Sequence, residues 1–200
     1  MTTSQKSSAF SRRSFSNSNA TQTLLAFAGL IVIFIVFSIA SDNFFKFDNI
    51  VGILLATGVN GVLALGATFV IITAGIDLSV GTVMTLSAVM TGVVITNMGL
   101  PIPVGVLAGL LTGMVAGTTN GLFISRFKIP PFIATLGMMM IARGLSLVIS
   151  GVKPIYFTET PIFRQMTMGS VIGAVIPGFA IPNAVLILFG AAIVAAFILS

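Results

Sequence analysis

Four polar or charged side chains stand inside otherwise apolar stretches, and their types are suited to binding or moving a polar solute. Asp77 is the single charged residue between positions 50 and 125, and Arg143 lies within a later apolar run. Asn60 and Asn120 add two carboxamides. A charged side chain at a bilayer centre costs about 2.5–3.5 kcal/mol, so each charge needs a structural or functional reason.

Asp77 belongs to the motif AGIDLSVG over residues 74–81, for which two compatible interpretations exist. In the structural interpretation, Gly75 takes the left-handed conformation after a helix, and Gly81 lets another backbone come close. Asp77 then caps the next helix by accepting backbone N–H groups, with help from Ser79. In the functional interpretation, the broken segment lines a substrate path, because irregular backbone at membrane depth requires surrounding protein or water.

The other three polar residues also have two interpretations each. Arg143 is either a functional intramembrane charge, with Asp77 as a candidate partner, or a long side chain that reaches an interface. Asn60 and Asn120 are either hydrogen-bonding contacts between helices or ligands for a substrate, and the first use is the more common.

One apolar run carries a glycine at every fourth position. The five members are Gly105, Gly109, Gly113, Gly117 and Gly121. This spacing places them on one face of a helix, where small residues let two helices approach closely. The ridge predicts tight packing inside the subunit or, alternatively, an interface between subunits.

The composition identifies the elements that must position these residues. The chain is 56% hydrophobic and 6% charged, whereas soluble domains carry about 25% charged residues. We expect an all-α, polytopic transmembrane helical bundle with about six spans, because apolar stretches of about 18 or more residues recur. The expected spans are residues 24–40, 50–73, 78–97, 102–124 and 132–149, followed by a sixth apolar run at 184–199.

The remaining segments complete the expected organisation. Residues 1–22 are polar and predict a flexible tail, and 23–200 form the membrane domain. Arg12 and Arg13 faintly resemble a twin-arginine export signal, but the apolar run that follows exceeds the usual signal core of about 7–15 residues. The sixth run spans only about 24 Å, so we expect the chain to be part of a longer protein.

Basic residues set the expected orientation, because they favour the cytoplasmic side. Lys6, Arg12 and Arg13 lie in the tail, and Arg126 and Lys128 lie in the loop before the fifth span. With both segments inside, five spans alternate consistently and the N-terminus is cytoplasmic. The Asp77 break is then a cytoplasmic turn if the second span crosses fully, and otherwise a re-entrant segment.

Several kinds of chemistry are not expected. The sequence has no phosphate-binding Gly-x-x-x-x-Gly-Lys-Ser/Thr loop, no nucleophile elbow, no histidine and no cysteine. Catalytic residues, a metal site and a cofactor in this chain are therefore not predicted. The small, scattered net charge of +5 reflects topology and does not suggest nucleic acid.

The motifs together resemble a known family. The block GATFVIITAGIDLSVG over residues 66–81 is similar to the signature of bacterial ABC-importer permeases for ribose and related monosaccharides. Shorter matching pieces follow in the family's order at residues 41–45, 120–121, 129–136 and 142–144.

The resemblance implies a permease subunit that forms the translocation path for a sugar in the bacterial inner membrane. It implies a longer protein of roughly ten spans, a second permease copy in a homodimer or heterodimer, a cytoplasmic ATP-binding subunit that hydrolyses ATP, and a periplasmic sugar-binding protein. Permeases for ribose, allose, xylose, galactose, fructose and autoinducer-2 look alike at this motif, so the sugar is not specified. The alternative is an ion-coupled secondary transporter or channel in which Asp77 or Arg143 couples to the ion.

Overall fold

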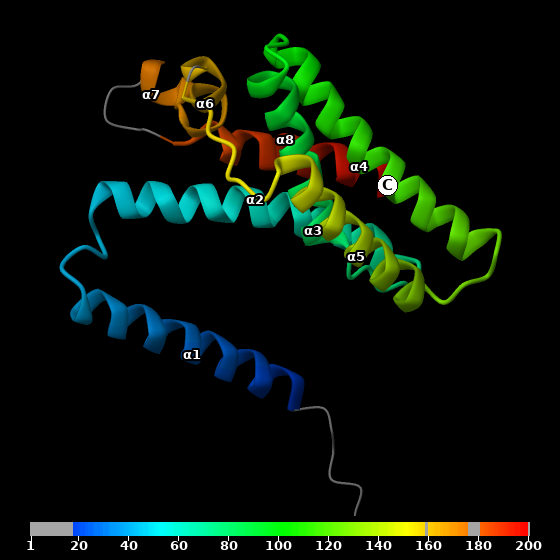
Figure 1. The fold of residues 1–200 in the computed structure, drawn as a ribbon. Coiled ribbons are helices and arrows are strands. Elements are labelled where there is room, and N and C mark those ends of the chain that lie inside the picture. The colour runs from blue at the N-terminus through cyan, green and yellow to red at the C-terminus, as the bar shows by residue number, and fades with distance from the viewer. Residues whose placement is uncertain (1–17, 159, 176–180, 200) are drawn as a thin grey trace, which may run out of the picture. The chain divides into compact units, whose positions relative to one another are not determined.

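The computed structural model describes residues 18–158, 160–175 and 181–199, and all the regular structure within them is helical (Figure 1). The elements are α1 Ser18–Ala40, α2 Phe47–Ile72, α3 Val80–Gly92, the π-helix η2 Val93–Asn97, α4 Ile102–Ser125, α5 Pro131–Ser150, α6 Pro161–Met168, α7 Val171–Val175 and α8 Asn183–Leu199. Among the described residues, five helices are apolar and long enough to cross a membrane, with α3 and η2 counted together. The predicted all-α membrane fold is thereby confirmed, and α8, as expected, is shorter.

The contacts divide the chain into two units, residues 1–50 and 51–200, and each is described by itself. In the first unit α1 begins at Ser18, so the tail predicted over residues 1–22 is wrong at its C-terminal boundary. A helix adds one hydrogen bond for each residue it gains, which lets it extend beyond its most apolar window. Residues 1–17 of that tail lie outside the described part.

The end of α1 is held by aromatic packing. The ring centroids of Phe34 and Phe44 lie 5.1 Å apart, and those of Phe44 and Phe45 also lie 5.1 Å apart. The Asn49 side-chain amide donates a hydrogen bond to the Phe44 carbonyl at 2.8 Å. The family-like residues 41–45 therefore form a turn fastened to the helices on either side.

In the second unit α3 packs against both α4 and α5 (Figure 1). The core of this three-helix cluster contains Leu86, Val94, Ile95, Ala116, Ala134, Met138 and Ala142. Breakers in the sequence mark the helix limits. Pro131 occupies the first turn of α5, where a proline leaves no hydrogen bond unmade, and Gly151 ends α5 with φ of 62°.

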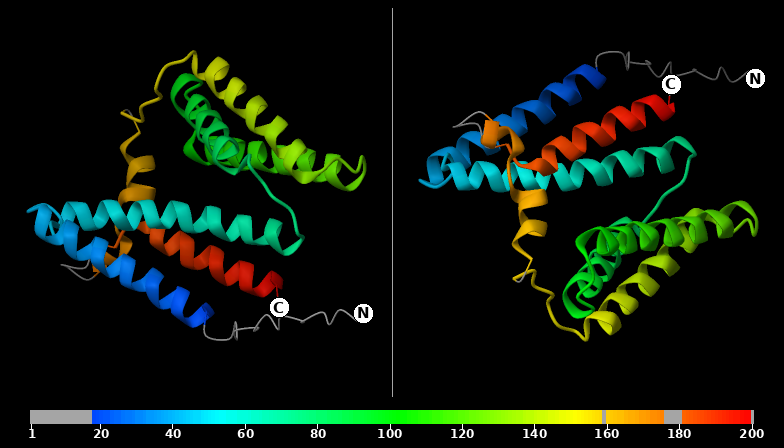
Figure 2. Two further views of the ribbon diagram at one scale, coloured as in Figure 1. Left: turned by 90° about the horizontal axis from the view of Figure 1, so that it is seen from below. Right: turned by 90° about the horizontal axis from the view of Figure 1, so that it is seen from above.

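A second contact in this unit joins α2 and α8, which run side by side (Figure 2). A methyl group added at Gly58 would lie 3.0 Å from the backbone of Ala184, and one at Gly61 would lie 2.7 Å from Leu188 Cδ1. Sequence reasoning missed both glycines, although their three-residue spacing on one helix is the signal for close packing. The α6–α8 connection is closed by Asn183, whose backbone N–H donates to the Gly169 carbonyl at 2.8 Å.

Candidate functional site

The turn after α2 uses a different left-handed residue from the one predicted. Ala74 has φ of 57°, whereas Gly75 does not have positive φ, so the prediction for Gly75 is wrong. The Ala74 N–H donates to the Ile71 carbonyl at 2.9 Å and the Gly75 N–H to the Val70 carbonyl at 3.0 Å, which is a Schellman motif. Glycine suits position 75 for space, since a methyl group there would lie 3.1 Å from Val70 Cγ1.

This geometry predicts that Ala74→Gly stabilises the protein. An L-residue in the left-handed region costs about 1–2 kcal/mol, which glycine avoids. Part of this gain is offset by the larger chain entropy of glycine in the unfolded state. We expect the unfolding midpoint of the purified protein in detergent to rise. The matched control Ala64→Gly lies inside α2 and should lower stability by about 1 kcal/mol. Equal losses in both variants would contradict the assigned conformation.

Asp77, Ser79 and Asn120 form a hydrogen-bonded chain at the start of α3. Asp77 Oδ1 accepts from the Ser79 backbone N–H at 2.7 Å and from the Ser79 hydroxyl at 2.6 Å. Asn120 Nδ2, on α4, donates to Ser79 Oγ at 3.1 Å. Ser79 is 1% exposed and Asn120 is 6% exposed, so the bonds form away from solvent, where hydrogen bonds polarise one another.

The predicted helix cap is displaced by two residues. The N-cap of α3 is Ser79, and its side chain makes no capping bond. Asp77 does accept a backbone N–H, as expected of a carboxylate near a helix start, but the donor is Ser79. Asp77 therefore shapes the turn before the helix. Its carboxylate still lies near the helix N-terminus, whose partial positive charge favours a negative group.

The turn is also attached to α5 through Thr135, a residue that was not among the predicted site residues. Its hydroxyl lies 3.2 Å from the Ile76 carbonyl and 2.8 Å from the Pro131 carbonyl, and Thr135 is 2% exposed. The only sequence signal for this role was its place in the family-like residues 129–136. Two helices thus hold the Asp77 turn in one position.

The remaining predicted polar residues do not join this cluster. Arg143 is exposed on α5, eight residues beyond Thr135 and about 12 Å along the helix, and no ion pair links it to Asp77 within the described residues. Asn60 is exposed on α2 and contributes to an apolar hollow beside α8. Gly81 is exposed with no described neighbour within 4 Å of where its Cβ would be, so the close backbone approach predicted for it is absent there.

The glycine ridge of α4 divides into two halves. Gly105 and Gly109 are buried against α3 and η2, where a Cβ would collide with the side chains of Ile95 and Thr91, respectively. Gly113 faces the Ser87 hydroxyl at an ordinary contact distance. Gly117 and Gly121 face open space in the described structure. The first half of the ridge therefore serves packing inside the unit.

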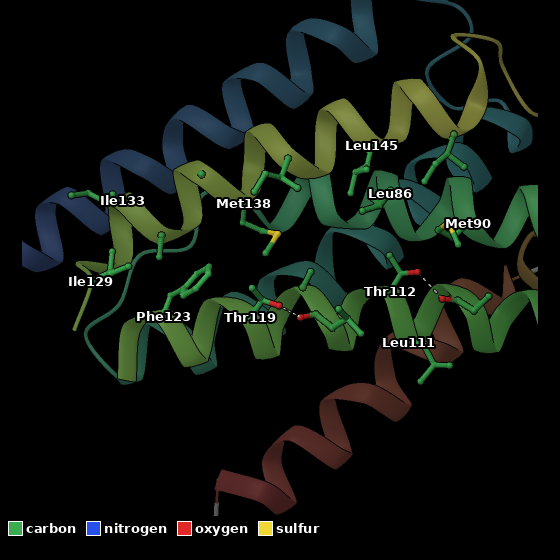
Figure 3. A pocket seen from close by; sticks show the side chains of 17 residues that line it. Leu86, Met90, Leu111, Thr112, Thr119, Phe123, Ile129, Ile133, Met138 and Leu145 are labelled. Atoms are coloured by element: carbon green, nitrogen blue, oxygen red, sulfur yellow. Dashed lines mark hydrogen bonds between the residues drawn. The ribbon is translucent and has the colours of Figure 1, made fainter. Parts of the chain in front are cut away.

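An apolar groove beside this cluster is unsuited to a polar ligand. A groove of about 890 Å³ lies between α3, α4 and α5, and its lining is almost entirely apolar, with Leu86, Phe123 and Met138 among the lining residues (Figure 3). Thr112 and Thr119 also line it, but their hydroxyls donate to carbonyls of their own helix at 2.8 and 2.7 Å. Little hydrogen-bonding capacity remains there for a solute.

The site is thus a polar turn held in place at one end of a cluster of membrane-type helices. Comparison with known proteins identifies the family. Residues 49–200 match the model of the branched-chain amino acid transport system / permease component family. The chain belongs to this family. The predicted resemblance to bacterial importer permeases is thereby confirmed.

Three similar proteins are named as permeases for ribose or xylose. The ribose import permease protein RbsC of Haemophilus influenzae is 36% identical over 155 residues, covering 76% of this chain and 48% of that protein. The RbsC protein of Bacillus subtilis is 36% identical over 169 residues, covering 84% and 52%. The xylose transport system permease protein XylH of H. influenzae is 33% identical over 169 residues, covering 82% and 45%.

The chain spans about half the length of these curated relatives. No solved structure matches it.

Proposed function

We propose that this chain contributes to the translocation path of an ATP-driven importer, as the membrane-spanning permease subunit, and that the cargo is a monosaccharide such as ribose. The observation that carries the proposal is the family match over residues 49–200, together with similar permeases named for ribose and xylose. The family description is of a permease component, so ATP hydrolysis falls to a separate subunit and the chain itself needs no cofactor.

The proposed assembly has four further parts. A cytoplasmic ATP-binding subunit supplies energy, a periplasmic sugar-binding protein delivers cargo, a second permease copy completes the path, and the lipid bilayer surrounds it. Nucleic acid has no part in it. Exposed apolar side chains support a lipid environment around the helices: on α1, Leu24, Phe27 and Ile31 are each more than half exposed.

The proposed orientation places the N-terminus in the cytoplasm of a bacterial cell, with the permease in the inner membrane. The Asp77 turn and the basic loop containing Arg126 and Lys128 lie at the same end of the α3–α4–α5 cluster, because α3 and α5 begin where α4 ends. Basic loops favour the cytoplasmic side, so both segments are assigned to it. With 26 residues, α2 is long enough to cross a bilayer, which supports a cytoplasmic turn rather than a re-entrant segment.

The test is reconstitution of the full-length protein into proteoliposomes. With its ATP-binding and sugar-binding partners, we expect ATP-dependent accumulation of radiolabelled ribose or xylose, and without them no accumulation. Sugar flux by the permease alone, driven by an ion gradient and abolished by Asp77→Asn, would instead establish the ion-coupled alternative. The structure argues against that outcome, because Asp77 is already engaged by two hydrogen bonds from Ser79.

A further inference from the structure

A polar pocket lies at the end of the helix cluster opposite the Asp77 turn. Its volume is about 570 Å³, within the range of about 300–1,000 Å³ typical of ligand pockets. Asn97 stands 18 residues after Ser79 along α3 and η2, about 27 Å away, which is close to the thickness of a hydrocarbon core. The pocket and the turn therefore belong to opposite membrane faces. The polar lining residues are Thr96, Asn97, Ser150, Lys153, Tyr156, Thr158 and Thr160.

One wall of the pocket is shaped by the π-helix η2. The Met98 N–H donates to the Val93 carbonyl at 3.0 Å, five residues back, as π-type winding requires. Such segments are rare and occur often at functional sites. The Thr96 hydroxyl lies 2.8 Å from both the Gly92 carbonyl and Asn97 Oδ1, so its single proton has two possible acceptors, and Asn97 Nδ2 has no acceptor among the described residues.

The backbone between the lining residues Ser150 and Lys153 is strained. Val152 has φ of 58°, which a β-branched residue rarely adopts, and its N–H donates to the Leu147 carbonyl at 2.9 Å. Strain of this kind concentrates at functional sites. The chain then passes the end of α3, where a methyl group at Gly92 would lie 2.9 Å from Ile155 Cγ2. This close contact holds Lys153 and Tyr156 at the pocket.

The pocket has unused hydrogen-bonding capacity. Thr160 Oγ1 is buried and has no partner in the described structure, a situation that costs about 1–3 kcal/mol. Within the same described residues, Asn97 Nδ2, Lys153 Nζ and the Tyr156 hydroxyl also donate to no protein group. A ligand with several hydroxyls would satisfy this set of donors and acceptors. The Tyr156 ring offers an apolar face to the C–H groups of such a ligand.

From these observations we infer that the pocket is a monosaccharide-binding subsite on the outer face, where sugar first contacts the permease. This inference rests on the proposed import function. A sugar fits better than an anion, because among the described lining residues Lys153 is the one cation and the other polar groups are hydroxyls and an amide. Anion sites typically use bidentate arginine or several backbone N–H groups.

The test uses site-directed alkylation of the full-length permease assembled with its ATP-binding subunits in proteoliposomes. These 200 residues contain no cysteine, so an introduced cysteine is their only thiol. We expect Thr158→Cys to react with a membrane-impermeant maleimide and to be protected by D-ribose or D-xylose. Asp42→Cys is the control: Asp42 is exposed in the loop between α1 and α2, which the proposed cytoplasmic N-terminus places on the outer face, and it should react without protection. Inorganic phosphate should protect neither site.

Two further substitutions, each combined with Thr158→Cys, link protection to the proposed contacts. Asn97→Leu and the nearly isosteric Thr160→Val should each raise the half-protecting sugar concentration about tenfold, as expected for one lost hydrogen bond. Elution on gel filtration shows whether each variant remains assembled.

The outcomes separate the subsite from the import function. Sugar transport by the complex, with no protection of Thr158→Cys, would overturn the subsite and leave the import function intact. Equal protection by phosphate would also overturn it. Protection without ATP-dependent transport would support the subsite and contradict the importer.

Discussion

Replacing Gly109 with leucine is expected to separate α3 from α4 and to have the largest effect on stability of any change considered. A Cβ at this position would lie 3.0 Å from the Ser87 carbonyl and would overlap the Thr91 hydroxyl. Because one obstacle is backbone, a rotamer change cannot relieve it, and the helices must move apart. Overpacking typically costs about 1–3 kcal/mol of stability, and we expect the cost of Gly109→Leu to be at or above the upper end of this range.

The measurement is the unfolding midpoint of the purified protein in detergent, together with its yield in membranes. Gly117→Leu is the matched control, since it makes the same change on the same helix, where no described atom lies within 4 Å. We expect Gly109→Leu to lose most of its folded yield while Gly117→Leu remains near the parent level. Equal tolerance of both would contradict the packing of α4 on α3. Loss of dimer in Gly117→Leu alone would assign the outer half of the ridge to a subunit interface.

The second large effect is expected for Ser79→Ala, which removes the central hydroxyl of the Asp77–Ser79–Asn120 chain. Asn120 Nδ2 would lose its acceptor in a buried site, and Asp77 Oδ1 would lose one of its two donors. A buried polar group left without a partner costs about 1–3 kcal/mol. Asn120 Oδ1 already lacks a partner in the described structure, so the amide would be left without any described hydrogen bond.

Thermal unfolding and limited proteolysis of the turn measure this effect. Ser125→Ala is the control, because Ser125 is exposed near the same end of α4 and its loss should change stability by less than about 0.5 kcal/mol. Ser79→Thr retains a hydroxyl and should recover part of the stability. If Ser79→Ala were as stable as Ser125→Ala, the chain of hydrogen bonds would not hold the turn.

The positions of the membrane spans followed from sequence because hydropathy, proline and glycine act locally. The predicted spans over residues 102–124 and 132–149 agree with α4 and α5 to within one residue at each end. Pro131 and Gly151 set the limits of α5 through their own backbone chemistry. The family was also recognisable from sequence, since its motif is a continuous run of residues.

The partners of the Asp77 turn could be decided only by the tertiary structure. Ser79 and Asn120 are separated by 41 residues, and Thr135 and Ile76 by 59. The sequence predicted an N-cap residue for α3 and a left-handed residue after α2, and it assigned them to Asp77 and Gly75. In the structure the N-cap is Ser79 and the left-handed residue is Ala74. The polar pocket likewise combines η2 with the lining residues at 150, 153–156, 158 and 160.

Sequence alone therefore determined which segments are helices, where breakers end them and which family they belong to, because these depend on neighbouring residues. Only the tertiary structure decided that Gly109 is buried while Gly117 is open, and that Asn120 binds Ser79. The physical reason is that the sequence of a helix does not specify which of its faces is buried, because only the helices packed against it decide that.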